Sequence, residues 1–208
     1  MLNNPVARRV VGRVIEPAAR GLLRLRVSPD AVTVVGTVGT AAAALYFFPQ
    51  GRFFPGVVVI CVFVFSDLLD GTMARLAGRS GPWGNFLDST LDRVGDGAIF
   101  GGLLVWFVRE QDWWTTAAAL VCLIGGAVVP YAKARAESVG ARADVGIAER
   151  AERLIVALVA AGLAGLGVPY VLPAALDVLA VLTVITIAQR MVVVRRQLVG
   201  RDNGTADP

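Results

Sequence analysis

Six apolar segments separated by short polar links take up most of this chain, and they limit what it can fold into. We place them at roughly 31–48, 54–76, 85–108, 113–136, 154–166 and 171–194. Several approach the about 20 residues that an α-helix needs to cross the hydrocarbon core of a bilayer. With 56% hydrophobic and 17% charged residues, the chain is too apolar for an ordinary soluble domain. The sequence therefore predicts an all-α integral membrane protein with six transmembrane helices.

The first 27 residues differ from the rest because arginines alternate with valines and leucines. They contain no apolar core of the length that a signal peptide needs. The pattern favours an amphipathic helix lying in the membrane interface, and a plain basic tail is the alternative. Ser28-Pro29-Asp30 then reads as a helix start, with serine as the N-cap and proline at the first helical position. We thus expect an interfacial helix at 1–27, a six-helix membrane domain at 28–196 and a polar C-terminal tail at 197–208.

The distribution of basic residues predicts the orientation in the membrane. Nearly all lysines and arginines lie in the N-terminal segment, the link at 75–79, the stretch at 133–153 and the end of the chain after 190. By the positive-inside rule these segments are cytoplasmic. Six spans then put both termini in the cytoplasm, and the lipid bilayer of the plasma membrane is the expected location. No nucleic-acid partner is expected.

Four aspartates between the second and third apolar segments are the candidate functional centre. Asp67 and Asp70 are three residues apart, and Asp88 and Asp92 are four apart. On a helix, either spacing puts both carboxylates on one face, with Cβ atoms about 5–6 Å apart. Acids at a membrane need a partner, and Mg²⁺ and Ca²⁺ prefer carboxylate oxygens. The sequence therefore predicts two divalent cations here.

The absence of histidine limits the acid–base chemistry of this centre. A general base that works at neutral pH must then be a carboxylate or, less readily, a lysine or tyrosine with a shifted pKa.

The residues from Asp67 to Asp92 follow the spacing Asp-x₂-Asp-Gly-x₂-Ala-Arg-x₈-Gly-x₃-Asp-x₃-Asp. This resembles the signature of the CDP-alcohol phosphotransferases at every fixed position. The resemblance implies transfer of a substituted phosphoryl group from a CDP-linked donor to an alcohol, with release of CMP, in a homodimer. It also implies that Asp67, Asp70 and Asp88 ligate two Mg²⁺ ions, for which Mn²⁺ can substitute. Asp92 would then be both a ligand and the acceptor of the alcohol's proton.

The same resemblance, with the residue types in this sequence, gives a candidate donor site. An arginine suits a pyrophosphate because it is always charged and can bind in two places at once. A glycine lets the nucleotide lie against the backbone. The residues expected to bind CDP-diacylglycerol are Asp30, Ala31, Val32, Thr33, Gly71, Arg75, Ser80 and Gly81.

A second group of charged residues is the candidate acceptor site, and it consists of Lys133, Arg135, Arg153 and Arg195. Single cytoplasmic cations usually determine topology only, but a group facing one cavity would bind a phosphorylated alcohol. From Val27 to Arg196 the chain resembles actinobacterial members of the family whose acceptor is inositol phosphate, notably at Lys-Ala-Arg-Ala-Glu-Ser and Glu-Arg-Ala-Glu-Arg-Leu. Pro130 departs from that pattern, in which a serine is expected.

Two other functions remain open at this point. Glycerol 3-phosphate as the acceptor would also need a cationic site, so charge does not separate it from inositol phosphate. A membrane cation carrier could use the aspartates to bind its ion, but Arg75 beside them would repel a cation.

Overall fold

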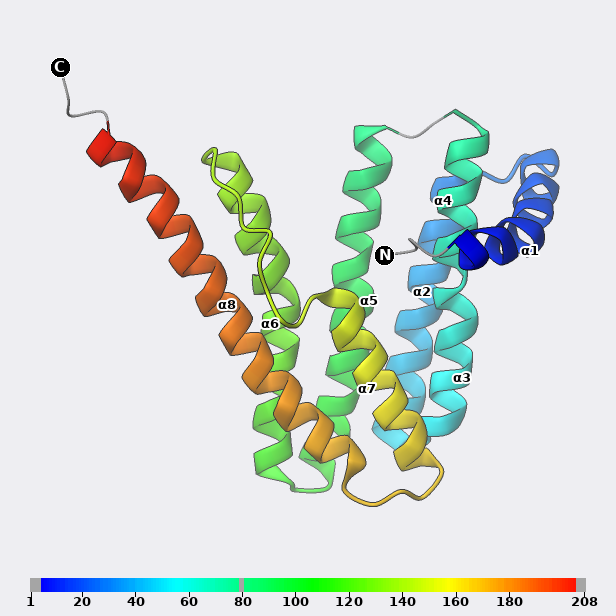
Figure 1. The fold of residues 1–208 in the computed structure, drawn as a ribbon. Coiled ribbons are helices and arrows are strands. Elements are labelled where there is room, and N and C mark those ends of the chain that lie inside the picture. The colour runs from blue at the N-terminus through cyan, green and yellow to red at the C-terminus, as the bar shows by residue number, and fades with distance from the viewer. Residues whose placement is uncertain (1–4, 79–80, 205–208) are drawn as a thin grey trace.

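Helices form nearly all of the chain (Figure 1). The computed structural model describes residues 5–78 and 81–204, without the side chains of 5–14, 66–68 and 201–204. Within these residues there are no strands, which confirms the all-α prediction. The α-helices are α1 (Pro5–Arg24), α2 (Pro29–Phe47), α3 (Phe53–Val64), α4 (Ser66–Leu76), α5 (Pro82–Arg109), α6 (Trp113–Ser138), α7 (Arg150–Gly165) and α8 (Val171–Gly204), and a 3₁₀ turn at Phe48–Gln50 follows α2.

The predicted count of six spans is not confirmed. In the described part, four segments are long and apolar enough to cross a membrane, namely Pro29–Gln50, Phe53–Leu76, Trp113–Ser138 and Val171–Gly200. Helix α5 is long enough, but it carries four charged residues between positions 88 and 96, namely Asp88, Asp92, Arg93 and Asp96. Helix α7 has only 16 residues, fewer than the about 20 that span a hydrocarbon core.

Two predicted boundaries also differ from the structure. The second apolar segment is two helices, α3 and α4, which meet at Phe65. The last helix continues to Gly204, so the segment expected to be a polar tail from 197 is helical up to that residue. The predicted helix at the N-terminus is present as α1, which contacts α4, and its position relative to a membrane stays a prediction.

Small residues bring α2 and α5 close enough to build a shared core. A Cβ atom added at Gly102 of α5 would lie 2.6 Å from the carbonyl oxygen of Ala44 in α2. Such a contact is too short, so only glycine permits this approach. Around it Phe48, Phe100 and Leu103 are fully buried. This packing joins the last turn of α2 to the second half of α5.

Large apolar side chains on the outer faces stay exposed, including Val35 (63%), Val38 (61%) and Val62 (65%). Exposed apolar surface of this extent marks contact with lipid or with another protein. It agrees with a membrane protein.

The segment between α6 and α7, residues 139–149, runs back along α6 and α8 (Figure 1), and we call it the connecting loop. Helix α8 holds it at three points. Gln197 exchanges two hydrogen bonds with the backbone of Arg142 (2.8 and 2.7 Å), Arg190 donates to the carbonyl of Val145 (2.9 Å), and Thr186 accepts from the N–H of Ala148 (3.1 Å). The loop therefore delivers the start of α7 to the middle of α5 (Figure 1).

Candidate functional site

A cavity of about 520 Å³ lies where α2, α4 and α5 come together, and we call it the donor cavity. The first turn of α2 forms part of its wall. Ser28 accepts a hydrogen bond from the N–H of Ala31 (3.2 Å) and Pro29 occupies the first turn, which confirms the predicted start of α2. The residues that line it include Asp30, Thr33, Asp70, Gly71, Gly81, Trp83, Asp88 and Arg150.

The carboxylate of Asp70 is the most enclosed acid of the cavity. The residue is 7% exposed, and the hydroxyl of Thr33 donates to its Oδ2 at 2.5 Å. Because Thr33 comes from α2 and Asp70 from α4, this bond joins two walls of the donor cavity. Asp88, from α5, lines the same cavity and is exposed.

Asp92 lies one turn further along α5, where the start of α7 reaches it. The guanidinium of Arg150 is 2.9 Å from Oδ1 of Asp92 and 3.1 Å from Oδ1 of Asp96. Arg93 is 3.4 Å from the other oxygen of Asp92. Asp96 is only 3% exposed, so a buried carboxylate here has the charged partner that burial requires. Arg150 thus links α7 to both acids.

The side chains available as metal ligands fit hard divalent cations. Asp70 and Asp88 bring carboxylate oxygens into one cavity, and the chain has no histidine. Among the described residues, no group of three or more aspartate, glutamate, cysteine or histidine side chains is arranged to hold a metal ion. The side chain of Asp67, the fourth predicted ligand, lies outside the described residues. Asp70 and Asp88 are therefore the described residues best placed to contribute to a metal site.

The predicted donor residues divide into two sets. Asp30, Thr33, Gly71 and Gly81 line the donor cavity. Ala31 and Val32 are in the first turn of α2 but do not line it. Ser80 lies outside the described residues.

Arg75 also does not line the cavity. It is exposed and donates to the carbonyl of Gly71 and to the hydroxyl of Thr72, both at 3.1 Å on its own helix. Asp30, Thr33 and the two glycines thus lie at the cavity, whereas the arginine would have to turn to reach it.

The four predicted acceptor residues lie in different surroundings. Lys133 forms an ion pair with Asp144 of the connecting loop (2.5 Å), and the hydrogen bond from Lys133 lowers the pKa of the Asp144 carboxyl. Arg135 is exposed and donates to Ser138 (3.1 Å). Arg195 is exposed on α8.

Arg153 differs from these because it is 2% exposed. Its Nη2 donates to the carbonyl of Cys122 at 2.6 Å, and its guanidinium lies 5.2 Å from the ring centroid of Phe100. Its Nε has no hydrogen-bond partner in the described part, which leaves one buried donor available to a ligand.

Two arginines that the sequence pattern did not single out are central to this region. Arg150 joins Asp92 and Asp96, as described above. Arg190, 4% exposed, donates to the carbonyls of Val129 (2.6 Å) and Val145 (2.9 Å). Arg150 could have been found from its spacing to Arg153, since residues three apart share a helix face. Nothing local distinguishes Arg190, whose partners are 61 and 45 residues away.

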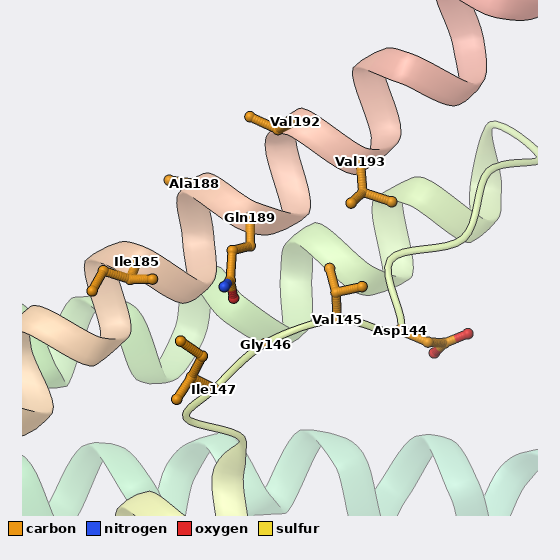
Figure 2. Close-up of a pocket in the computed structure, with 9 residues that line it drawn as sticks. All are labelled: Asp144, Val145, Gly146, Ile147, Ile185, Ala188, Gln189, Val192 and Val193. Carbon is orange, nitrogen blue, oxygen red and sulfur yellow. The ribbon is translucent and has the colours of Figure 1, made fainter.

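A second cavity, of about 750 Å³, lies between residues 144–147 of the connecting loop and one face of α8 (Figure 2). Most of its side chains are apolar, and Gln189 of α8 points from the helix toward the loop (Figure 2). None of the predicted site residues lines this cavity.

Residues 26–189 match the sequence model of the family described as CDP-alcohol phosphatidyltransferase. The chain belongs to this family, and it is an enzyme that transfers a substituted phosphate group.

Its relatives include the phosphatidylinositol phosphate synthase of Streptomyces avermitilis, 51% identical over 98% of this chain and 86% of that protein. The enzyme of the same name from Mycobacterium marinum is 47% identical over 89% of this chain and 81% of that protein.

Solved structures agree. The Mycobacterium tuberculosis phosphatidylinositol phosphate synthase with CDP-DAG bound superposes with a TM-score of 0.84 at 44% identity, covering 88% of this chain and 94% of that chain. Its complex with manganese and citrate gives the same TM-score of 0.84 at 44% identity, covering 87% and 88% of the two chains.

Proposed function

We propose that this chain transfers the phosphatidyl group of CDP-diacylglycerol to inositol phosphate and releases CMP. One observation carries the proposal. The family motif builds an acid-lined cavity at the ends of α2, α4 and α5, in a chain 44% identical to an enzyme solved with CDP-DAG bound. That enzyme is a phosphatidylinositol phosphate synthase, and the same reaction is proposed for this chain.

The proposed metal site comprises Asp67, Asp70, Asp88 and Asp92, with two Mg²⁺ ions that Mn²⁺ can replace. Divalent ions there neutralise the pyrophosphate and stabilise the charge that develops during displacement. Support comes from the oxygen-only donor set of Asp70 and Asp88 at the cavity and from manganese in the M. tuberculosis structure.

Asp92 is the proposed base. Its carboxylate takes the proton of the acceptor hydroxyl while the hydroxyl oxygen forms a bond to the phosphatidyl phosphorus, and the bond from that phosphorus to CMP breaks. Arg150 orients the carboxylate through its contact at 2.9 Å. The donor headgroup lies in the cavity against Gly71 and Gly81, where no side chain blocks a close approach. Arg75 reaches the pyrophosphate after leaving its contacts on α4.

Lys133, Arg135, Arg153 and Arg195 are the proposed acceptor residues, and Arg153 has the strongest support. It is buried close to Asp96, one turn beyond the proposed base, and its Nε is unsatisfied in the described part. An unpaired buried donor is costly, so a phosphate that accepts from it would bind favourably. Arg190 contributes indirectly, because it fixes the connecting loop that carries Asp144, the partner of Lys133.

The proposed setting is the plasma membrane, with six spans and with both termini and the site in the cytoplasm. The basic residues at both ends of the chain support this orientation, with α1 lying in the interface. We also propose a homodimer. In the single chain, a Cβ atom added at Gly97 or Gly101 of α5 meets nothing within 4 Å, which leaves a face of small residues that another helix could approach.

The experiment that tests this function follows CMP release by the purified protein with CDP-diacylglycerol, Mg²⁺ and one acceptor at a time. Inositol phosphate should support release, and free inositol should not, because it carries no charge for the cations to bind. Faster release with glycerol 3-phosphate than with inositol phosphate would contradict the proposal and establish the other acceptor.

A further inference from the structure

The second cavity, between the connecting loop and α8, is mostly apolar and has no role in the proposed reaction. It shares no lining residue with the donor cavity. Helix α8 packs against α6 and α7, whereas the donor cavity lies between α2, α4 and α5. Several side chains that line the second cavity are exposed, including Ile147 (56%), Ile185 (38%) and Val192 (48%). A ligand of this cavity would therefore bind away from the donor.

Polar contacts hold the connecting loop beside α8, so the second cavity is built into the fold. Arg190 donates to the carbonyl of Val145 (2.9 Å), and Thr186 accepts from the N–H of Ala148 (3.1 Å). Between these two points, a Cβ atom added at Gly146 would lie only 2.6 Å from Cγ2 of Thr186. The volume of about 750 Å³ is within the about 300–1,000 Å³ that small-molecule sites occupy.

Arginine follows the apolar wall that α8 gives to the second cavity. Val192 and Val193 line the cavity, and Arg196 comes four and three residues later, which puts it on the same helix face one turn further along. Gln197 binds the backbone of Arg142 at 2.8 and 2.7 Å, so a second arginine lies near this end of the cavity. Both arginines are exposed, and neither forms an ion pair with a carboxylate of the described side chains.

Asp144 is the one acidic residue among the described residues that line the second cavity, and it already has a partner. Its carboxylate forms the ion pair with Lys133 at 2.5 Å. The charge available to a ligand at this end is therefore positive. Basic sites between helices on the cytoplasmic side of a membrane bind anionic lipid headgroups, and an apolar wall beside them suits an acyl chain.

We propose that the second cavity binds an anionic phospholipid of the cytoplasmic leaflet, a lipid other than the donor. One acyl chain lies along Ile185 and Val192, and the phosphate lies at Arg196 and Arg142. The proposal goes beyond the proposed function and takes from it only the orientation of α8, whose last turns are cytoplasmic. Because the chain lies between the connecting loop and α8, the lipid also stabilises the loop.

The headgroup contact is tested by native mass spectrometry of the purified, delipidated full-length protein with dioleoylphosphatidylglycerol or dioleoylphosphatidylcholine. Phosphatidylglycerol should bind more tightly, because no choline balances the charge of its phosphate. Arg196→Gln should weaken the binding of phosphatidylglycerol about 5-fold, the effect of one arginine near an anionic headgroup, and should leave phosphatidylcholine unchanged. Arg52→Gln is the matched control, since Arg52 is an exposed arginine before α3 that does not line the cavity. It should change neither affinity.

The acyl-chain contact is tested by filling the second cavity. Ala188 lines it and is exposed, so Ala188→Phe should put a ring where the chain lies. Both lipids should then bind about 15-fold more weakly, the loss expected when two methylene groups of the chain are displaced. Ala42→Phe is the control, because it adds the same ring at an exposed position of α2 outside the cavity.

Equal binding of the two lipids, or equal losses in a variant and its control, would overturn the inference. Displacement of phosphatidylglycerol by equimolar CDP-diacylglycerol would also overturn it, because the cavity would then hold the donor's chain. A changed oligomeric state in Ala188→Phe without a change in lipid binding would assign the cavity to a second copy of the chain instead. Thermal unfolding checks that each variant is folded.

The proposed function fails separately, because lipid binding is measured without either substrate. A protein that binds phosphatidylglycerol as expected, but releases no CMP from CDP-diacylglycerol with inositol phosphate, would contradict the function and leave the lipid site supported.

Discussion

The acidic and the basic parts of this site satisfy their charges in different ways. Asp70 and Asp88 line an open cavity, whereas Arg153 and Arg190 are buried and bound to backbone carbonyls. A ligand that enters the cavity can therefore reach both acids. The two arginines already have partners and also hold helices and the connecting loop together. Arg150 is the contact between the two parts, because it starts α7 and pairs with Asp92 and Asp96 of α5.

Because of this difference, loss of the ligand from the acidic part and loss of an arginine from the basic part should have different effects on activity and stability. Removing the ligand of the acids should abolish the reaction and leave the fold in place. Removing a buried arginine should affect both binding and stability, because breaking a buried charged contact leaves its partners unsatisfied.

The largest expected effect is that of metal removal. After exhaustive chelation, CMP release should fall to background, and Mg²⁺ or Mn²⁺ should restore it, because hard cations suit a site of carboxylates. Far-UV circular dichroism should show the helices still folded without metal. Full CMP release from chelated protein would contradict the metal site.

The next effect in size is that of Asp92→Asn. Turnover should fall at least about 100-fold, the lower range for loss of a general base, while CMP binding changes little. Asp177→Asn is the control, since Asp177 is a half-buried acid away from the donor cavity that accepts a hydrogen bond from Trp114 at 3.2 Å. Near-normal turnover in Asp92→Asn would show that another group accepts the proton.

A smaller effect is expected for Arg150→Gln, which breaks the contact between the acidic and basic parts. Asp96 is buried, so loss of its partner should lower the melting temperature of the metal-free protein, and Mn²⁺ should restore part of the loss. Arg196→Gln, an exposed change near the end of α8, should do neither. An unchanged melting temperature in Arg150→Gln would show that this ion pair does not stabilise the fold.

The structure places two predicted acids at one cavity but places the predicted cations in different surroundings, and the difference has a physical reason. Asp70 and Asp88 belong to one motif carried by the consecutive helices α4 and α5, and both line the donor cavity. The partners of Arg190 are two backbone carbonyls, at Val129 and Val145. Every residue has a backbone carbonyl, so no pattern of side chains in the sequence can predict this contact.

In the fold too, features with a local sequence signal were predicted and features without one were not. The serine cap at Ser28 was predicted from local chemistry and is present. The break between α3 and α4 at Phe65 was not predicted, since no glycine or proline marks it and the backbone of Phe65 is itself helical (φ −63°, ψ −20°). In the opposite direction, Pro130 lies inside α6 without ending it. Local sequence signals therefore do not account for the helix break at Phe65 or for the continuation of α6 through Pro130.

The measurement that tests the account most directly is a comparison of KM values for the two substrates in Arg153→Gln. The proposed donor site lies at the acids, and the proposed acceptor phosphate site lies at the basic group. The KM for inositol phosphate should therefore rise about 10- to 150-fold, which corresponds to roughly 1.5–3 kcal/mol for a lost charged hydrogen bond, while the KM for CDP-diacylglycerol changes less than about 2-fold. Arg135→Gln, at an exposed site on α6, should give a smaller rise for the same acceptor. An equal rise for both substrates in a folded Arg153→Gln variant, or no rise for either, would contradict the separation of the two sites.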